Sequence, residues 1–185
     1  MDHFAFVAKI YDRIIPSPDP ERLQSLLNLP VQGAMLDAGG GTGRASSPFA
    51  ALVGQLVISD LSFAMLKQAG CKNGMAPLQA HAERLPFPDE SFDRIVVVDA
   101  LHHFCDQREA IRDLMRVLKT GGRLVIEEPD IERPVVKAVA LAEKLLLMGS
   151  RFYTANRVAA MIRARGGCVK IEKDGRFVYW VVADK

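Results

Sequence analysis

Two kinds of hydrophobic pattern alternate along this chain of 185 residues. Short, nearly continuous apolar runs are typical of parallel strands that are buried on both faces. These runs lie at 34–36, 56–58, 94–98 and 123–126. Helical spacing predicts helices between and after them, near 44–53, 62–70, 106–119, 135–149 and 154–165. The alternation predicts an α/β fold, in which helices cover both faces of a doubly wound, parallel sheet.

The segment 106–119 has the clearest helical signals. Its apolar residues recur at i, i+3, i+4 and i+7, which places them on one face: Ile111, Leu114, Met115 and Leu118. Asp106 and Glu109 resemble a capping box, in which each side chain bonds the backbone N–H of the other residue. Gly121 can then supply a left-handed stop for the helix.

Both ends of the chain depart from the strand–helix alternation. Residues 168–173 and 176–183 are two strand-like runs joined through Asp174-Gly175, which is a strong hairpin signal. Residues 1–30 are expected to form an N-terminal helix followed by a broken approach to the sheet. The prolines that indicate this break are Pro16, Pro18, Pro20 and Pro30.

Composition narrows the class of protein without naming a function. The length suits one domain, and the apolar (49%) and charged (25%) fractions are ordinary for a soluble globular protein. A net charge of +2 gives no argument for nucleic-acid binding. Three widely separated cysteines without a C-x-x-C pair predict a reduced, cytoplasmic protein. The N-terminus lacks a signal peptide, and the apolar segment 135–148 is too short and too charged to span a membrane.

A glycine-rich turn follows the first predicted strand. The sequence from Leu36 to Arg44 contains the pattern D-x-G-x-G-x-G, with glycines at 39, 41 and 43. Such a turn brings bare backbone close to a ligand, where a side chain would collide. A dinucleotide fingerprint that starts at Gly39 would need its third glycine at the position of Arg44. The spacing therefore argues against a nicotinamide dinucleotide.

This turn resembles motif I of the class I S-adenosylmethionine-dependent methyltransferases, and further segments continue the resemblance in family order. These segments are 57–62, 82–93, 100–104 and 116–124, and 82–93 resembles the A-E-x-L-P-F-x-D-x-S-F-D signature of the small-molecule branch. The branch that contains the ubiquinone/menaquinone C-methyltransferases is the most similar, although those enzymes are usually longer. The resemblance implies a Rossmann-like, seven-stranded sheet that is mostly parallel, with an antiparallel strand from the C-terminal hairpin. It also implies one methyltransferase domain over 1–185, with a cap helix in 1–30 and an acceptor-side helical insertion in 129–153.

The resemblance also implies a binding site for S-adenosylmethionine. Asp37 would face the ammonium group of this cofactor, and Asp60 would accept hydrogen bonds from both ribose hydroxyls. Leu61 would pack on the adenine ring, while the backbone N–H of Ala82 would address the adenine edge. Asp99 would lie toward the methionine end. The implied cofactor residues are Tyr11, Asp37, Gly39, Gly40, Gly41, Gly43, Asp60, Leu61, His81, Ala82, Glu83 and Asp99.

Other uses of these residues stay open. Asp37 and Asp60 could each cap the helix that follows its strand. His81 departs from the family, which commonly has Asp at this position to bond the adenine amino group, although a ring nitrogen could still accept that bond. A segment resembling a family lid could cover the methionine end with an aromatic ring, or pack as a helix on the core. Its residues are Phe4, Ala8, Tyr11 and Asp12.

Catalysis places few demands on the side chains. A sulfonium releases a neutral leaving group, so the protein mainly positions and desolvates the reactants. A base is needed only where the acceptor must lose a proton, and the candidates are His102, His103 and Tyr153. The histidine pair follows a strand and could instead be structural. No metal is predicted, because no Asp, Glu and His set repeats near this pair with ligand spacing.

The sequence thus predicts an enzyme that transfers a methyl group from S-adenosylmethionine to a small, apolar or aromatic metabolite and releases S-adenosylhomocysteine. The apolar segment 135–152 would supply an acceptor pocket, a face for a homodimer, or ordinary core burial. The alternative from another class is a noncatalytic or regulatory protein that binds an adenosyl ligand with the same fold.

Overall fold

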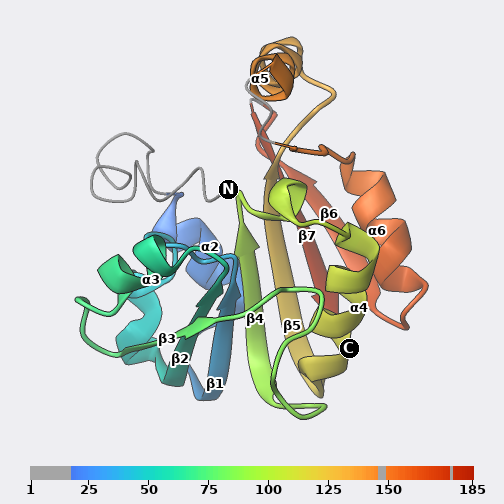
Figure 1. Cartoon of the computed structure of the whole chain (residues 1–185). Helices are drawn as coiled ribbons and strands as arrows, with labels where there is room; N and C mark the ends of the chain where they lie inside the picture. Colours follow the sequence, from blue (N-terminus) through green and yellow to red (C-terminus); the bar gives the residue numbers. More distant parts are fainter. Residues whose placement is uncertain (1–17, 146–148, 176) are drawn as a thin grey trace.

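A seven-stranded sheet forms the centre of the computed structural model, which describes residues 18–145, 149–175 and 177–185 (Figure 1). The strands are β1 (Val31–Ala38), β2 (Val53–Asp60), β3 (Met75–Gln79), β4 (Phe92–Val98), β5 (Leu118–Pro129), β6 (Cys168–Lys173) and β7 (Val178–Asp184). Their order in the sheet is β3-β2-β1-β4-β5-β7-β6. Strands β1 to β5 pair in parallel, and β7 pairs antiparallel with both β5 and β6. The predicted fold class is confirmed, including the antiparallel strand of the C-terminal hairpin.

Helices cover both faces of the sheet. They are α2 (Pro20–Leu27), α3 (Phe63–Ala69), α4 (Gln107–Val117), α5 (Pro134–Leu145), α6 (Ala155–Arg163) and the 3₁₀-helices η1 (Ser47–Leu52) and η2 (Leu101–His103). Side chains along each strand alternate between two cores, as the pleat requires. In β5, Leu124 and Ile126 pack with α4 and α6, whereas Val125 packs in the core that contains α2, η1 and α3.

The chain after the glycine turn differs from the expectation. The pattern predicts an α-helix near 44–53, but the residues up to Ser46 form turns and only η1 follows. Pro48 lies at the start of η1, where its ring removes an N–H and disfavours an α conformation at the residue before it. The predicted helix is therefore present only over 47–52, as a 3₁₀-helix.

Two further elements were not anticipated. Strand β3 has no fully buried residue and contains Pro77, so it lacks the apolar run that marks the other parallel strands. It lies at the edge of the sheet, where a proline costs no ladder hydrogen bond. Helix α2 lies within the proline-rich segment, where a broken chain was expected. Asp19 caps it by accepting the N–H groups of Glu21 and Arg22 at 3.0 and 3.2 Å, and Pro20 suits the first helical turn.

Helix α4 begins as predicted, but its capping box is half formed. Oδ1 of Asp106 accepts the N–H groups of Arg108 and Glu109 at 2.9 and 3.1 Å. The side chain of Glu109 pairs with Arg112 instead of returning to Asp106, whose N–H donates to Glu83 at 3.1 Å. Gly121 does not end the helix, because α4 stops at Val117 and the chain passes directly into β5.

Helix α5 lies inside the expected acceptor-side insertion and beyond one end of the sheet (Figure 1). Val135 and Val139 are each 49% exposed and Leu141 is 59% exposed, whereas Val136 is buried. Ordinary core burial therefore does not account for the apolar character of this helix. Within the part of the chain that the structure describes, no helix has the length and hydropathy needed to cross a membrane.

Candidate functional site

A cavity of about 420 Å³ opens where β1, β2 and β4 end at the carboxyl edge of the sheet. Its walls include most of the residues that the sequence assigned to a cofactor: Asp37, Gly39, Gly40, Gly41, Asp60, Leu61, Ala82, Glu83 and Asp99. Gly43 and His81 are not among the described lining residues, and Tyr11 lies outside the described residues. The lining also includes His103, which the sequence analysis named as a candidate base, and residues that it did not assign: Thr42, Arg44, Ala45, Ser62, Met65, Ala80, Val98, Ala100 and Phe104.

The glycine turn forms the floor of this cavity. Gly39, Gly41 and Gly43 all have positive φ angles, of 72°, 56° and 71°, which other residues rarely adopt. At Gly39 space is also lacking, since an added Cβ would lie 2.7 Å from the Cβ of Ala100. The N–H of Gly39 donates to the carbonyl of Ser59 at 2.8 Å, which ties the turn to β2. Conformation and space together require bare backbone here.

Asp60 joins the two turns that border the cavity. Its Oδ2 accepts the N–H of Gly41 at 2.9 Å, and its Oδ1 accepts the N–H of Ser62 at 2.8 Å. The cap of α3 is Ser62, whose Oγ accepts the N–H of Met65 at 3.4 Å. Asp60 therefore does not cap that helix, and its carboxylate holds the glycine turn beside the cavity wall.

Asp37 is buried beside the glycine turn. The hydroxyl of Ser46 donates to Oδ2 of Asp37 at 2.5 Å, whereas Oδ1 has no hydrogen-bond partner among the described residues. Burial raises the pKa of Asp37 to about 6, although the Ser46 hydrogen bond opposes that shift. Asp37 does not cap η1, the helix that follows β1, since Ser46 occupies its N-cap position. A buried carboxylate oxygen in a cavity wall suits a cationic group of a ligand.

The residues assigned to the adenine end lie on two loops. Leu61 follows β2 and is 47% exposed, while Ala82 and Glu83 follow β3. His81 is exposed, and its ring nitrogen Nδ1 lies 3.7 Å from a carboxylate oxygen of Glu83. The departure from the family pattern at His81 therefore falls on a side chain outside the described lining.

The opposite end of the cavity is formed by the turn after β4. Asp99 has a positive φ of 53°, and Ala100, His103 and Phe104 of this turn line the cavity with it. Burial, together with the neighbouring His102, lowers the pKa of His103 to about 3, so its imidazole is neutral at physiological pH. Its Nδ1 lies 3.1 Å from the hydroxyl of Ser150.

His102 is turned into the protein. Its side chain is 3% exposed, and its Nδ1 lies 2.7 Å from Oε2 of Glu128. Oε1 of Glu128 accepts the N–H groups of Ala100 and Leu101 at 2.9 and 2.8 Å. The ring of Phe152 stacks on that of His102, with 4.3 Å between the centroids. Glu128 and His102 thus fix the turn that carries His103, and the sequence analysis did not anticipate Glu128.

Tyr153, the third candidate base, is absent from the described cavity lining. Its ring lies 3.7 Å from the guanidinium carbon of Arg157, and its carbonyl accepts the hydroxyl of Tyr179 at 3.0 Å. Of the three candidates, His103 lines the cavity. Among the described residues, no group of three or more His, Cys, Asp or Glu side chains could hold a metal ion.

The donors and acceptors in this site fit S-adenosylmethionine. The unpartnered oxygen of Asp37 offers an acceptor to an ammonium group, and the glycine backbone leaves room that side chains would fill. The carboxylate of Asp60 provides two acceptor oxygens at the cavity wall.

Comparisons with known sequences agree with this geometry. Residues 36–126 match the family described as a methyltransferase domain. The chain is 35% identical over 116 residues to the ubiquinone/menaquinone biosynthesis C-methyltransferase of Pectobacterium carotovorum, which covers 57% of this chain and 45% of that relative. The chain therefore spans less than half the length of this curated relative.

Solved structures have a similar fold. The YcgJ protein of Bacillus subtilis has a TM-score of 0.74 and 27% identity, covering 83% of this chain and 69% of that chain. A chain in the complex between the Haloferax volcanii Trm112 methyltransferase activator and a methyltransferase has a TM-score of 0.80, covering 100% of this chain and 98% of that one. Its identity of 16% shows a likeness of fold alone.

Proposed function

Because residues 36–126 match the methyltransferase domain family, we propose that this chain transfers the methyl group of S-adenosylmethionine to a small, apolar or aromatic molecule. The observation that carries the proposal is the cavity at the carboxyl edge of the sheet. Its glycine floor and the buried, unpartnered oxygen of Asp37 match the methionine portion of the cofactor. The product of the transfer is S-adenosylhomocysteine.

Asp37 and Asp60 would hold the polar groups of the cofactor. The Oδ1 atom of Asp37 would accept a hydrogen bond from the ammonium group, which also neutralises a buried charge. Asp60 would accept the ribose hydroxyls while Gly41 and Ser62 keep its carboxylate in place. The backbone from Gly39 to Gly41 would pass beneath the methionine portion, with Gly43 completing the turn.

The adenine ring would lie between the loops after β2 and β3. Leu61 would cover one face of the ring, and the backbone N–H of Ala82 would donate to its edge. Glu83 lines the same end of the cavity. His81 is not among the described lining residues, so its exposed side chain would have to rotate to reach the adenine amino group.

The acceptor would bind at the end formed by Asp99 and the turn after β4. The cofactor supplies an electrophilic methyl carbon and leaves as a neutral thioether, so no residue needs to donate a proton. The neutral imidazole of His103 would orient a hydroxyl or amine of the acceptor without placing a second positive charge beside the sulfonium. His102 and Tyr153 would act by fixing the wall, because neither is among the described lining residues. Ala100 and Phe104 make this wall apolar, which supports an apolar or aromatic acceptor.

Calorimetry with S-adenosylhomocysteine tests the cofactor site. Asp60→Ala is expected to weaken binding by about 1.5–3 kcal/mol, because a charged hydrogen-bonding partner is lost. Asp19→Ala is the matched control, since Asp19 also accepts two backbone N–H groups but caps α2 and is not among the described residues that line the cavity. An unchanged dissociation constant for Asp60→Ala would refute the role given to Asp60.

Turnover separates an enzyme from a binding protein. We expect the purified chain to release S-adenosylhomocysteine when supplied with S-adenosylmethionine and a panel of quinols, phenols and aromatic amines. The quinols are included because the curated relative is named for ubiquinone/menaquinone biosynthesis. Mass spectrometry would identify the methylated product. Tight binding of S-adenosylhomocysteine without turnover of any acceptor would favour the noncatalytic alternative.

A further inference from the structure

The segment after β3 forms part of the adenine end of the cavity without regular structure of its own. Residues 80–91 contain no helix or strand. Ala80, Ala82 and Glu83 of this segment nevertheless line the cavity. A backbone N–H can recognise a base edge only when it is held in one place. The position of this segment must therefore come from its contacts with other elements.

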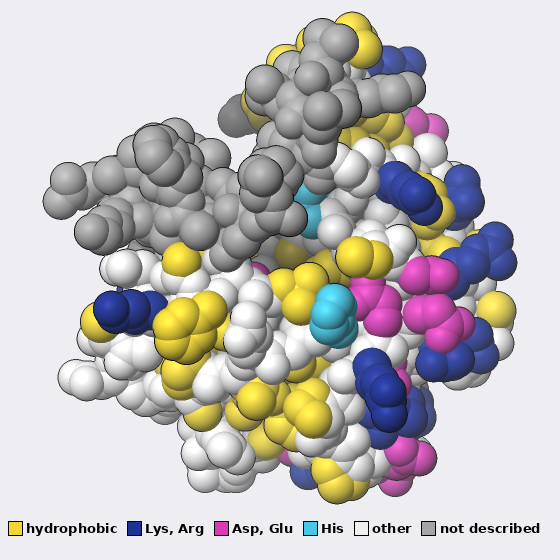
Figure 2. All heavy atoms as spheres, viewed as in Figure 1, with side chains coloured by type: hydrophobic (Ala, Val, Ile, Leu, Met, Phe, Trp, Pro, Cys, Tyr) yellow, Lys and Arg dark blue, Asp and Glu magenta, His cyan; other side chains and the backbone are white. Residues whose placement is uncertain are grey.

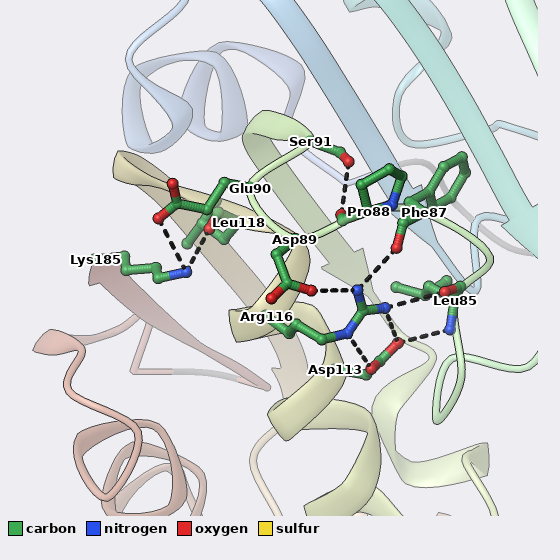
Figure 3. A network of polar contacts seen from close by, with 10 residues as sticks. All are labelled: Leu85, Phe87, Pro88, Asp89, Glu90, Ser91, Asp113, Arg116, Leu118 and Lys185. Atoms are coloured by element: carbon green, nitrogen blue, oxygen red, sulfur yellow. Dashed lines mark hydrogen bonds and ion pairs between the residues drawn. The ribbon is translucent and has the colours of Figure 1, made fainter.

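Arg116 of α4 makes three of these contacts through its guanidinium group (Figure 3). Its Nη1 donates to the carbonyl of Phe87 at 2.8 Å and to Oδ1 of Asp89 at 2.9 Å. Its Nη2 donates to the carbonyl of Leu85 at 3.0 Å. One side chain thus forms hydrogen bonds with Leu85, Phe87 and Asp89 of the segment.

Asp113 holds that guanidinium group and the segment at once. Its Oδ1 accepts Nε of Arg116 at 2.8 Å, and its Oδ2 accepts Nη2 at 3.0 Å. The same Oδ2 accepts the N–H of Leu85 at 2.6 Å. The side chain of Asp113 is 7% exposed, so water competes little for these bonds. Both backbone groups of Leu85 are therefore bonded to the Arg116–Asp113 pair, two residues after Glu83.

The other end of α4 holds the segment through Glu83, whose Oε1 accepts the N–H of Asp106 at 3.1 Å. The residues that line the cavity are thus anchored on one rigid helix at two points. The first anchor is the start of α4, and the second is the Arg116–Asp113 pair near its end.

We propose that Arg116 and Asp113 are positioning residues that set the affinity and base selectivity of the cavity for adenine, although neither lines it. The inference rests on the proposed contact between Ala82 and the adenine edge. A planar guanidinium fork can bond Leu85, Phe87 and Asp113 together, whereas the single ammonium of a lysine cannot reach all three. Loss of the fork would leave the charge in place but release the backbone that addresses adenine.

The test compares two ligands on two matched variants. S-Adenosylhomocysteine and S-inosylhomocysteine, in which an oxygen replaces the adenine amino group, are titrated by calorimetry. Arg116→Lys should weaken S-adenosylhomocysteine binding by ~10-fold and reduce the preference for the adenine ligand by at least ~3-fold. Arg112→Lys is the control, because Arg112 lies on the same helix, forms an exposed ion pair with Glu109, and keeps its charge in the variant. Exposed acidic and basic side chains also lie next to one another elsewhere on the surface, as Figure 2 shows for one face of the molecule. The control should stay within ~2-fold of the unsubstituted protein for both ligands.

Two results would overturn the proposal. One is a folded Arg116→Lys variant with unchanged affinities, and the other is equal weakening of both ligands, which would indicate general loosening of the cavity. Failure of the unsubstituted chain to bind S-adenosylhomocysteine would instead contradict the proposed function itself. If Arg116→Lys does not fold, Asp113→Asn serves as the second variant, since its amide has one acceptor oxygen and cannot accept both Nε of Arg116 and the N–H of Leu85. Amide exchange of Leu85 should then be faster in that variant while exchange within α4 is unchanged, and an unaltered Leu85 rate would count against the proposal.

Discussion

Asp37 and Asp60 end neighbouring strands and line one cavity, yet their carboxylates have different surroundings. Both oxygens of Asp60 accept backbone N–H groups, so its charge is compensated within the protein. Within the described part of the chain, Asp37 has one bonded and one unpartnered oxygen, and it is almost completely buried. The fold therefore carries a cost at Asp37 that a cationic ligand would remove.

That cost predicts how stability depends on pH. The pKa of Asp37 is raised from 3.8 to about 6, chiefly by burial, so the folded state favours the protonated form. Its contribution to stability is present below the ordinary pKa and is lost as the pH rises through about 6. Asp37→Asn, which carries no charge, should raise the free energy of unfolding of the ligand-free protein above that pH by about 1–3 kcal/mol. Urea unfolding between about pH 5 and pH 8 would measure both the gain and the flattened profile.

Binding should change in the opposite direction. S-Adenosylhomocysteine should bind the unsubstituted protein more tightly as the pH rises through about 6, because ionised Asp37 attracts the ammonium group. Asp37→Asn should weaken binding by about 1–3 kcal/mol and remove this dependence. A variant that is more stable and binds equally well would show that Asp37 does not meet the ammonium group.

At the scale of elements, the sequence predicted the strands and turns whose signals lie within a few neighbouring residues. The four apolar runs mark β1, β2, β4 and β5, and the hairpin signal at Asp174-Gly175 marks the connection between β6 and β7. Strand β3 was missed because an edge strand with Pro77 needs no apolar run. The cap of α4 was only half right, because Glu83 lies 23 residues before Asp106 and no local pattern connects them.

Separation along the sequence also decides which residues of the site could be predicted. The glycine turn and the acids after β1 and β2 belong to contiguous motifs, so the sequence could assign them. Glu128 lies 26 residues after His102, and Arg116 bonds Leu85 from 31 residues away. Contacts of this kind depend on how strands and helices pack, and a single sequence contains no periodicity that reports them.

The observed cap of α4 makes a prediction about its two acids. Asp106→Ala should lower the free energy of unfolding by about 1 kcal/mol, because two backbone N–H groups lose their acceptor. Glu109→Ala should change it by less than about 0.5 kcal/mol, because its partner Arg112 is exposed. Urea unfolding of both variants distinguishes this arrangement from a complete capping box, in which the two substitutions would cost similar amounts.

At the scale of the whole molecule, the two ends of the cavity are held by different sets of contacts, and α4 takes part in both. The adenine end depends on α4 and the segment after β3. The acceptor end depends on the turn after β4, which is tied to the chain beyond α5: the N–H of Arg151 donates to the carbonyl of His102 at 2.7 Å. The carbonyl of Arg151 in turn accepts Nε2 of Gln107 at 2.5 Å. The segment that contains Arg151 is thus fixed to the turn after β4.

Helix α5 offers a matched pair of residues for testing whether its apolar face belongs to the core. Val136 is 5% exposed and Val139 is 49% exposed on the same helix. Val136→Asp should lower the free energy of unfolding by more than about 2 kcal/mol, because it buries a carboxylate without a partner. Val139→Asp should change it by less than about 0.5 kcal/mol, because its side chain already meets solvent. Urea unfolding at two protein concentrations checks both values. A large, concentration-dependent loss for Val139→Asp would contradict an exposed helix face and indicate that a second copy of the chain covers it.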